Sequence, residues 1–377
     1  MHAFAQQAST LHRKKIMHIS FSQKTLPAAV LLALVGLSAP SVTLAQTSVA
    51  MPADFSIYGR VDLALESNND GQLGRTALQN FSSRFGFRGE RKFNDSLSGI
   101  FQVETGFAPD NTAQSKTLAS RNSFVGLKSS SMGTLIMGTH DMPLKSLEGT
   151  ANLLWGEGEA MEVIIHGKGS RAAVGNAVMD NVHTRKTNVV LYSSPKFSNI
   201  VAKLAYSPDE AQTATTNKTM YGASVEFNNG TWNLGLATQS QDKFTATGGA
   251  MAANKATVGV KMGDLTTGLA FSTLDNNSGK KTSNWMASVA YKMGATVLKA
   301  SYGASGESSS AANDGLDMTA LELDYAVDKA VTLYTYYAKI NNSAKAKASF
   351  AAADDFPVVG KLGDSPSALG FGIRYNF

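Results

Sequence analysis

The chain has no cysteine, which excludes disulfide bonds, thiol catalysis and thiolate metal sites. Proline is scarce, with 9 residues in 377, and only 17% of the residues are charged. Long hydrophobic runs are also missing: after residue 45 no stretch approaches the ~18 consecutive apolar residues that indicate a transmembrane helix. The sequence therefore does not encode a helical membrane protein.

The only sizeable apolar run, residues 26–37, lies near the N-terminus and follows Lys24. Small residues follow it at Thr43 and Ala45, in the arrangement of a secretory signal peptide cleaved after Ala45. Cleavage after Ala50 is a weaker alternative. The long stretch before Met17 makes Met17 an alternative start. We expect residues 1–45 to be the signal peptide and residues 46–377 the mature domain.

The formal net charge of +5 belongs mostly to this leader, which carries four basic residues and no acids. The 34 lysines and arginines of the whole chain minus these four leave 30, against 29 acids, so the mature chain is nearly neutral. Binding to nucleic acid is not supported.

The mature chain shows alternating apolar and polar residues in stretches of about ten, which is typical of half-buried strands. Residues 55–66, 97–107 and 369–377 show it best. In the first, Ile57, Val61 and Leu65 share one face, and Arg60 and Asp62 lie on the other. Alternation alone leaves open what covers the apolar face, and a soluble sandwich is an alternative.

Three features favour lipid on the apolar side. Short turns at 228–230, 263–264, 293–294 and 327–329 alternate with longer connections at 240–254, 275–283, 303–315 and 341–366. Aromatic residues lie near strand ends, and the opposite face is charged. We count about sixteen strands and predict an all-β fold, a sixteen-stranded antiparallel transmembrane β-barrel that encloses water.

Seven segments in this order and spacing resemble the general Gram-negative porins, in the branch common in beta-proteobacteria. They are 56–62 (SIYGRVD), 83–89 (SRFGFRG), 101–107 (FQVETGF), 121–127 (RNSFVGL), 133–138 (GTLIMG), 192–197 (YSSPKF) and 370–377 (GFGIRYNF). The resemblance implies a homotrimer in the cell outer membrane. It also implies a water-filled channel for passive diffusion of small hydrophilic solutes and ions, with a third loop folded inward to narrow the pore.

In this chain the matching loop lies at about residues 141–182. The resemblance implies that acids on this loop face basic residues of the wall across a constriction, an arrangement that selects ions. The candidate wall residues are Arg60, Arg84, Arg88 and Arg121. The candidate loop acids are Asp141, Glu148, Glu157, Glu159, Glu162 and Asp180.

The chain departs from the family pattern at two basic positions of the wall. Leu191 and the pair Thr139 and His140 stand where the family often has arginine. A strong anion preference is therefore not carried over to this chain. Compensation for these losses by Arg60 and Arg88 is a hypothesis.

The C-terminal strand carries Ile373, Tyr375 and Phe377, which resemble the signal read by the barrel-assembly machinery; an ordinary closing strand is the compatible alternative. Lipopolysaccharide is a further partner that an outer-membrane location implies.

An enzyme is not expected, because the mature chain has neither H-E-x-x-H nor G-x-S-x-G and no phosphate-binding glycine loop. His140, His166 and His183 all lie in or beside the third loop, and we expect neither a metal nor a cofactor there. A substrate-specific channel on the same fold and a secreted β-sandwich binding protein remain the rival functions.

Overall fold

The computed structural model describes residues 54–111, 117–167, 182–242, 249–275, 281–308, 312–353 and 356–377. The expected signal peptide and Asp180 lie outside these residues. No helix in the described part is both long enough and apolar enough to span a membrane.

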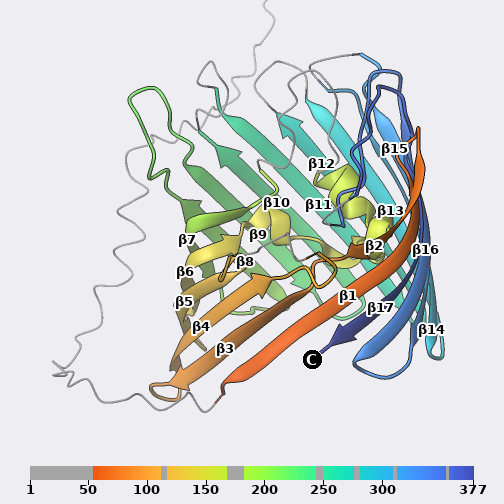
Figure 1. Ribbon diagram of the computed structural model, residues 1–377. Coiled ribbons are helices and arrows are strands. Elements are labelled where there is room, and N and C mark those ends of the chain that lie inside the picture. Colours follow the sequence, from red (N-terminus) through yellow and green to blue (C-terminus); the bar gives the residue numbers. More distant parts are fainter. Residues whose placement is uncertain are drawn as a thin grey trace, which may run out of the picture. The chain divides into compact units, whose positions relative to one another are not determined.

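The described residues form seventeen antiparallel strand segments in one sheet (Figure 1). In chain order they are β1 (Ser56–Asn69), β2 (Gly74–Asn80), β3 (Arg84–Lys92), β4 (Leu97–Gly106), β5 (Ser123–Ser129), β6 (Gly133–Asp141), β7 (Arg185–Ser193), β8 (Ile200–Ser207), β9 (Met220–Asn228), β10 (Trp232–Gln241), β11 (Met251–Met262), β12 (Leu265–Asp275), β13 (Thr282–Met293), β14 (Thr296–Ser305), β15 (Leu316–Ala326), β16 (Val331–Asn342) and β17 (Ser367–Asn376).

The sheet closes into a barrel because β1 pairs with β17, from Arg60 opposite Asn376 to Asn69 opposite Ser367. On its other side β1 pairs with β2 along its second half and with β3 along its first half. Segments β2 and β3 are therefore one strand of the wall, interrupted where Ser82 has a positive φ of 58°. The wall has sixteen strands, as the sequence predicts, and closure leaves no unpaired edge.

Alternation places the apolar side chains on the outside of the barrel. Along β1, Ile57 and Leu65 are exposed, whereas the inward Asp62 and Glu66 are fully buried. Aromatic side chains are exposed on the outer face of the other strands, among them Trp232, Phe271, Trp285, Tyr291, Tyr302, Tyr325, Tyr337 and Phe371. This is the reverse of a soluble sandwich, in which the apolar faces pack together, so the outer face is suited to lipid.

Connections at the two ends of the barrel differ in length. Short turns occupy one end, and several of them use a glycine in the left-handed region, among them Gly230 (φ 90°), Gly263 (φ 59°) and Gly294 (φ 62°), as tight hairpins require. The opposite end carries the longer connections, above all 142–184 between β6 and β7 and 343–366 between β16 and β17. We call these the third loop and the eighth loop.

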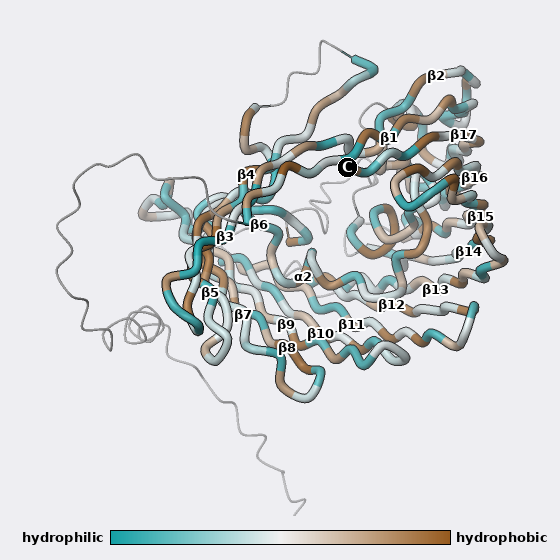
Figure 2. The backbone as a smooth tube through the Cα atoms, turned by 90° about the horizontal axis from the view of Figure 1, so that it is seen from below, coloured by the Kyte–Doolittle hydropathy of each residue, from teal (hydrophilic) through white to brown (hydrophobic). Residues whose placement is uncertain are grey.

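The described residues of the third loop, 142–167 and 182–184, include four helical turns: α2 (Pro143–Ser146), η1 (Gly149–Ala151), η2 (Gly156–Gly158) and the π-helical turn η3 (Met161–Ile165). They contact the strands from β8 to β16, and the view along the barrel shows coiled backbone within the ring of strands (Figure 2). Met161 and Ile164 are buried in one apolar cluster with Phe350 and Phe356 of the eighth loop. The two loops therefore share a small core.

Candidate functional site

The third loop is held by hydrogen bonds from inward-facing wall side chains to its backbone. Ser288 on β13 donates to the carbonyl of Ala151 at 2.7 Å, and Ser272 on β12 donates to that of Ile165 at 3.2 Å. Close approach also needs Gly268 on β12, because a Cβ there would lie 2.2 Å from the Thr150 carbonyl oxygen. The loop therefore follows the inner face of the wall over several strands.

Within the third loop, Trp155 lies against two arginines of the wall. The guanidinium carbons of Arg60 and Arg374 are 4.5 and 4.6 Å from the centre of its ring, within the range of cation–π contacts. The Trp155 amide donates to Oε2 of Glu322 at 2.5 Å. Charged side chains of β1, β15 and β17 therefore all contact the third loop at Trp155.

A second group of arginines lies near β4, β6 and β7. Arg121 pairs with Glu104 at 2.5 Å, and Arg185 pairs with Asp141 at 3.1 Å. Arg84 differs from both, because no carboxylate in the described residues lies within 4 Å of its guanidinium. Among the described residues, its guanidinium makes one hydrogen bond, a 3.5 Å contact to the Ser82 carbonyl. Unlike Arg121 and Arg185, Arg84 therefore has no ion-pair partner among the described residues.

Arg88 lies on the same strand face as Arg84, four residues nearer the short-turn end. Its guanidinium lies 5.0 Å from the centre of the Tyr58 ring, and its Nε donates to the hydroxyl of Ser56 at 3.0 Å. The four candidate wall arginines thus share a region of β1, β3 and the approach to β5. Arg88 is the one farthest from the third-loop contacts described above.

The loop acids fall into three environments. Asp141, the last residue of β6, is tied to Arg185, and Glu162 is buried with Nζ of Lys145 at 3.9 Å and Nδ1 of His166 at 3.3 Å. Both carboxylates therefore have cationic or imidazole neighbours. Neither is an open charge on the lumen.

Glu157 is almost wholly buried, and its carboxylate accepts hydrogen bonds from the amides of Ala352 and Ala353 in the eighth loop at 3.3 and 3.2 Å. Burial, followed by the nearby charge of Glu66, holds the pKa of the Glu157 carboxyl well above its ordinary value. Glu157 therefore links the two loops.

Glu148 and Glu159 are the partly exposed acids of the loop. The amide of Asn152 donates to both, at 3.1 Å to Glu148 and 2.7 Å to Glu159. The negative charge of Glu159 also interacts electrostatically with Arg60. Both side chains are partly accessible to solvent, unlike that of Glu157.

On β1, which is the neighbour of β3 in the wall, two buried carboxylates accept hydrogen bonds from tyrosines. The hydroxyl of Tyr334 donates to Asp62 at 2.6 Å, and that of Tyr336 donates to Glu66 at 2.6 Å. Arg374 also pairs with Asp62, at 2.7 Å. These bonds join β1, β16 and β17, which fixes the inner face where the barrel closes.

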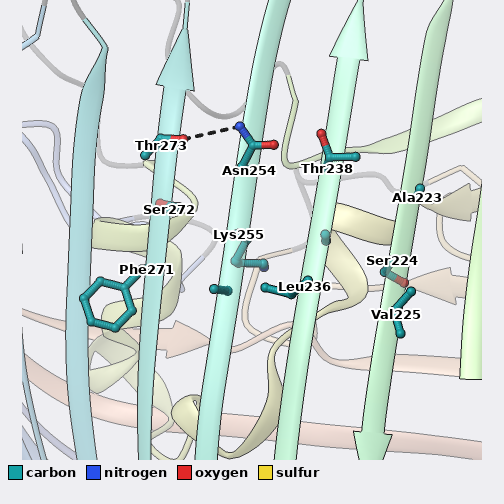
Figure 3. A pocket seen from close by; sticks show the side chains of 12 residues that line it. Ala223, Ser224, Val225, Leu236, Thr238, Asn254, Lys255, Phe271, Ser272 and Thr273 are labelled. Carbon is teal, nitrogen blue, oxygen red and sulfur yellow. Dashed lines mark hydrogen bonds between the residues drawn. The ribbon is translucent and has the colours of Figure 1, made fainter. Parts of the chain in front are cut away.

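Within the described residues no group of three or more metal-ligating side chains is found. His166 and His183 instead lie together, with ring centres 4.7 Å apart, and Nε2 of His166 is 3.1 Å from Nζ of Lys255. Lys255 is 2% exposed on β11. Figure 3 shows it in the wall of β9 to β12, one position along the strand from Asn254, whose amide donates to Thr273 at 3.5 Å.

The terminal strand places Phe377 against the start of β1. The Gly59 amide donates to the Phe377 carbonyl at 2.8 Å, and the Phe377 amide donates back to Gly59 at 3.1 Å. The rings of Tyr375 and Phe377 stack with centres 6.2 Å apart, and Ile373 is exposed on the same outer face. These three residues lie on the outer face at the junction between β1 and β17.

Sequence reasoning missed several site residues. The sequence pattern assigned no individual role to Arg374, Trp155, Arg185 or Lys255. Arg185 carried a usable signal, since it lies at the start of a strand next to the predicted loop. For Trp155 no signal existed, because its partners are far away in sequence.

The closed sheet, the apolar exterior and the charged interior define the class of this protein: it is a transmembrane β-barrel of the outer membrane. A family model described as Gram-negative porin matches residues 28–345, and the chain belongs to that family.

Relatives and solved structures agree with this assignment. The chain is 24% identical over 198 residues to the major outer membrane protein P.IB of Neisseria gonorrhoeae, covering 50% of this chain and 52% of that one. It is 29% identical over 201 residues to an outer membrane porin protein of Bordetella pertussis, covering 49% and 48%. The chain thus spans about half the length of these relatives.

Among solved structures, the anion-selective porin of Comamonas acidovorans has a TM-score of 0.70 at 22% identity, covering 86% of this chain and 99% of that one. OmpT of Vibrio cholerae in its trimer form has a TM-score of 0.64 at 16% identity, with the same coverage. At these identities the likeness concerns the fold alone.

Proposed function

We propose that this protein forms a water-filled channel through which small hydrophilic solutes and ions diffuse passively across the outer membrane. The observation that carries the proposal is the inner face of the barrel, where charged side chains from β1, β3, β14, β15 and β17 line a closed sixteen-stranded wall. A barrel of this size leaves an aqueous channel, because its own side chains do not fill the interior.

In this proposal the third loop narrows the channel, and charges on its two sides act on passing ions. Arg60, Arg84, Arg88 and Arg121 supply the basic wall, and Glu148 and Glu159 supply the acidic side. The electrostatic interaction between Arg60 and Glu159 supports this assignment. Asp141, Glu157 and Glu162 are proposed to hold the loop in place; Asp180 remains a sequence prediction.

We also propose a homotrimer, as the trimer form of Vibrio cholerae OmpT suggests for this fold. Lipopolysaccharide at the outer surface and the barrel-assembly machinery, reading Ile373, Tyr375 and Phe377, are the further proposed partners. Catalysis is not part of the proposal, nor is a metal or cofactor.

Planar-bilayer recording of the purified, detergent-solubilised protein tests the channel and the trimer together. We expect stepwise conductance increases in groups of three. Silent insertion of folded protein would contradict the channel, and single, ungrouped steps would contradict the trimer. The rival, a substrate-specific channel, predicts instead that conductance saturates with one class of solute.

A further inference from the structure

Trp155 is fixed in position by the wall. Its amide donates to Glu322, and the next residue, Gly156, has a φ of 61° and packs against the Tyr336 ring, where a Cβ would come within 2.7 Å. A side chain at position 156 would therefore strain the backbone and collide with the ring. The indole is thus held at one place on the inner face.

The indole covers a cation that has no carboxylate partner. Arg60 donates from Nε to Oδ1 of Asn376 at 3.0 Å, and within the described residues no carboxylate lies within 4 Å of it. Its Nη1 is buried without a hydrogen-bond partner in the described structure. Buried guanidinium nitrogens are almost always paired, so an aromatic face over this one is its main remaining contact.

Arg374 contacts the same ring, but its charge is already balanced. Its Nε lies 2.7 Å from Oδ2 of Asp62, and its side chain is 6% exposed. Pairing of Arg60 with Asn376 and of Asp62 with Arg374 places the two arginines two positions apart on the inner face. Arg374 therefore anchors the ring, and Arg60 is the cation whose availability depends on it.

We propose that Trp155 is a specificity-determining residue of the channel, which covers Arg60 and so withholds its positive charge from passing anions. This inference rests on the proposed channel function. An anion that approaches Arg60 must displace the indole and lose its cation–π contact. Arg84, which no aromatic ring covers in the described residues, is then the principal cation that anions meet.

The test is the permeability ratio of anion over cation, measured from the zero-current potential of the full-length protein in a bilayer under a KCl gradient. We expect W155A to raise this ratio by roughly twofold, which is the factor that corresponds to the free energy of one cation–π contact at a partly exposed site. W155F keeps an aromatic face and should raise it less. The rise should shrink when R60Q is added to W155A, because the uncovered charge is then gone.

A second comparison does not depend on the folding of W155A. In the otherwise unchanged protein, R84Q should lower the ratio more than R60Q does. An unchanged or lower ratio in W155A, a rise that persists in full in W155A/R60Q, or an R60Q effect equal to that of R84Q would overturn the role of Trp155. A wild-type protein that inserts but conducts nothing would instead overturn the channel function, so the two failures are distinct.

Discussion

The guanidinium of Arg185 lies 3.1 Å from the carboxylate of Asp141, and this ion pair joins the two ends of the third loop. Asp141 is the last residue of β6 and Arg185 the first of β7. Asn122 reinforces the pair, because its side-chain amide donates to Asp141 at 3.0 Å and its carbonyl oxygen accepts from Arg185 at 2.8 Å. The loop is therefore closed at its base by three side chains.

We expect D141N to loosen the base of the loop, since it leaves a partly buried arginine without its anion, a change that costs about 1–3 kcal/mol. Single-channel conductance should become noisier, with more frequent transitions between levels. E90Q is the matched control, because the Lys128–Glu90 pair is more exposed and lies away from the loop. Equal noise in D141N and E90Q would contradict a role of this pair in holding the loop.

Glu159 is expected to favour cations in the channel, because it is partly exposed and its charge acts on Arg60 across the loop contact. Replacing it by glutamine removes the charge and keeps a side chain that can still bind Asn152. We expect E159Q to raise the anion-over-cation permeability ratio measured under a salt gradient. E210Q, in the exposed connection between β8 and β9, is the control. A ratio that moves in both variants or in neither would remove Glu159 from the selectivity of the pore.

The fold was predictable from sequence because alternation acts locally. A strand with one oily face and one polar face carries its orientation in its own residues, so Ile57 and Leu65 are outside and Asp62 inside as the pattern predicts. The strand count followed from the spacing of turns. The break between β2 and β3 at Ser82 could not be predicted in this way, because it changes the direction of the backbone without changing which residues are apolar.

The site was predictable only in part because its contacts join distant segments. The loop acids could be named from sequence, but their environments could not. Glu157 is buried because the eighth loop covers it, and Glu162 because it meets Lys145 and His166. Nothing near Trp155 in the sequence indicates that Arg60 lies over its ring.

The link between the third and eighth loops leads to a prediction about Glu157. Its raised pKa lowers the cost of a neutral side chain at this position, so glutamine, which keeps one acceptor oxygen, should replace it with less loss than alanine, which removes both acceptors of the Ala352 and Ala353 amides. We expect trypsin to cleave the eighth loop after Lys347 or Lys361 several-fold faster in E157A than in E157Q, as loss of about 1 kcal/mol of hydrogen bonding implies.

Mass spectrometry of the cleaved fragments measures this difference. E210A serves as the control, because Glu210 is exposed and lies in another loop. If E157Q and E157A were cleaved equally fast, the carboxyl group would have no part in joining the loops through these two amides.

Closure of the barrel makes Gly59 intolerant of a side chain. A Cβ at this position would lie 2.4 Å from Cζ of Phe377 and 2.6 Å from the Arg84 carbonyl oxygen. The phenyl ring can turn away, but the backbone of β3 cannot, so G59A should destabilise the junction by about 1–3 kcal/mol. The expected result is that the folded band in SDS gels converts to the unfolded band at a lower temperature.

The control is F377A, which relieves the clash with the ring but not the clash with Arg84. The double variant G59A/F377A should therefore remain less heat-stable than F377A alone. Full recovery of stability in the double variant would show that only the terminal ring, and not the β3 backbone, excludes a side chain at Gly59.

Because His166 and His183 are buried, we expect acid to loosen the third loop. Burial, followed by the charge of Lys255, lowers the pKa of His166 to about 3, and burial with the same lysine lowers the pKa of His183 as well. Lys145 adds a second positive charge, and Glu162 is the acid that faces the pair among the described residues. The packed loop thus favours neutral histidines.

Proton linkage gives the direction in which pH changes the stability of the packed loop. Between pH 6.5, the ordinary value for histidine, and about pH 3, an opened loop binds a proton at His166 that the packed loop excludes. The packed state is therefore fully favoured above pH 6.5 and loses stability as the pH falls through this range. Recordings at pH 7.5 and pH 4 should show more frequent partial closures at the lower pH. H166Q cannot take up the proton and should weaken this response, whereas H140Q, outside the cluster, should keep it. A response unchanged by H166Q would place the acid-sensitive group elsewhere in the chain.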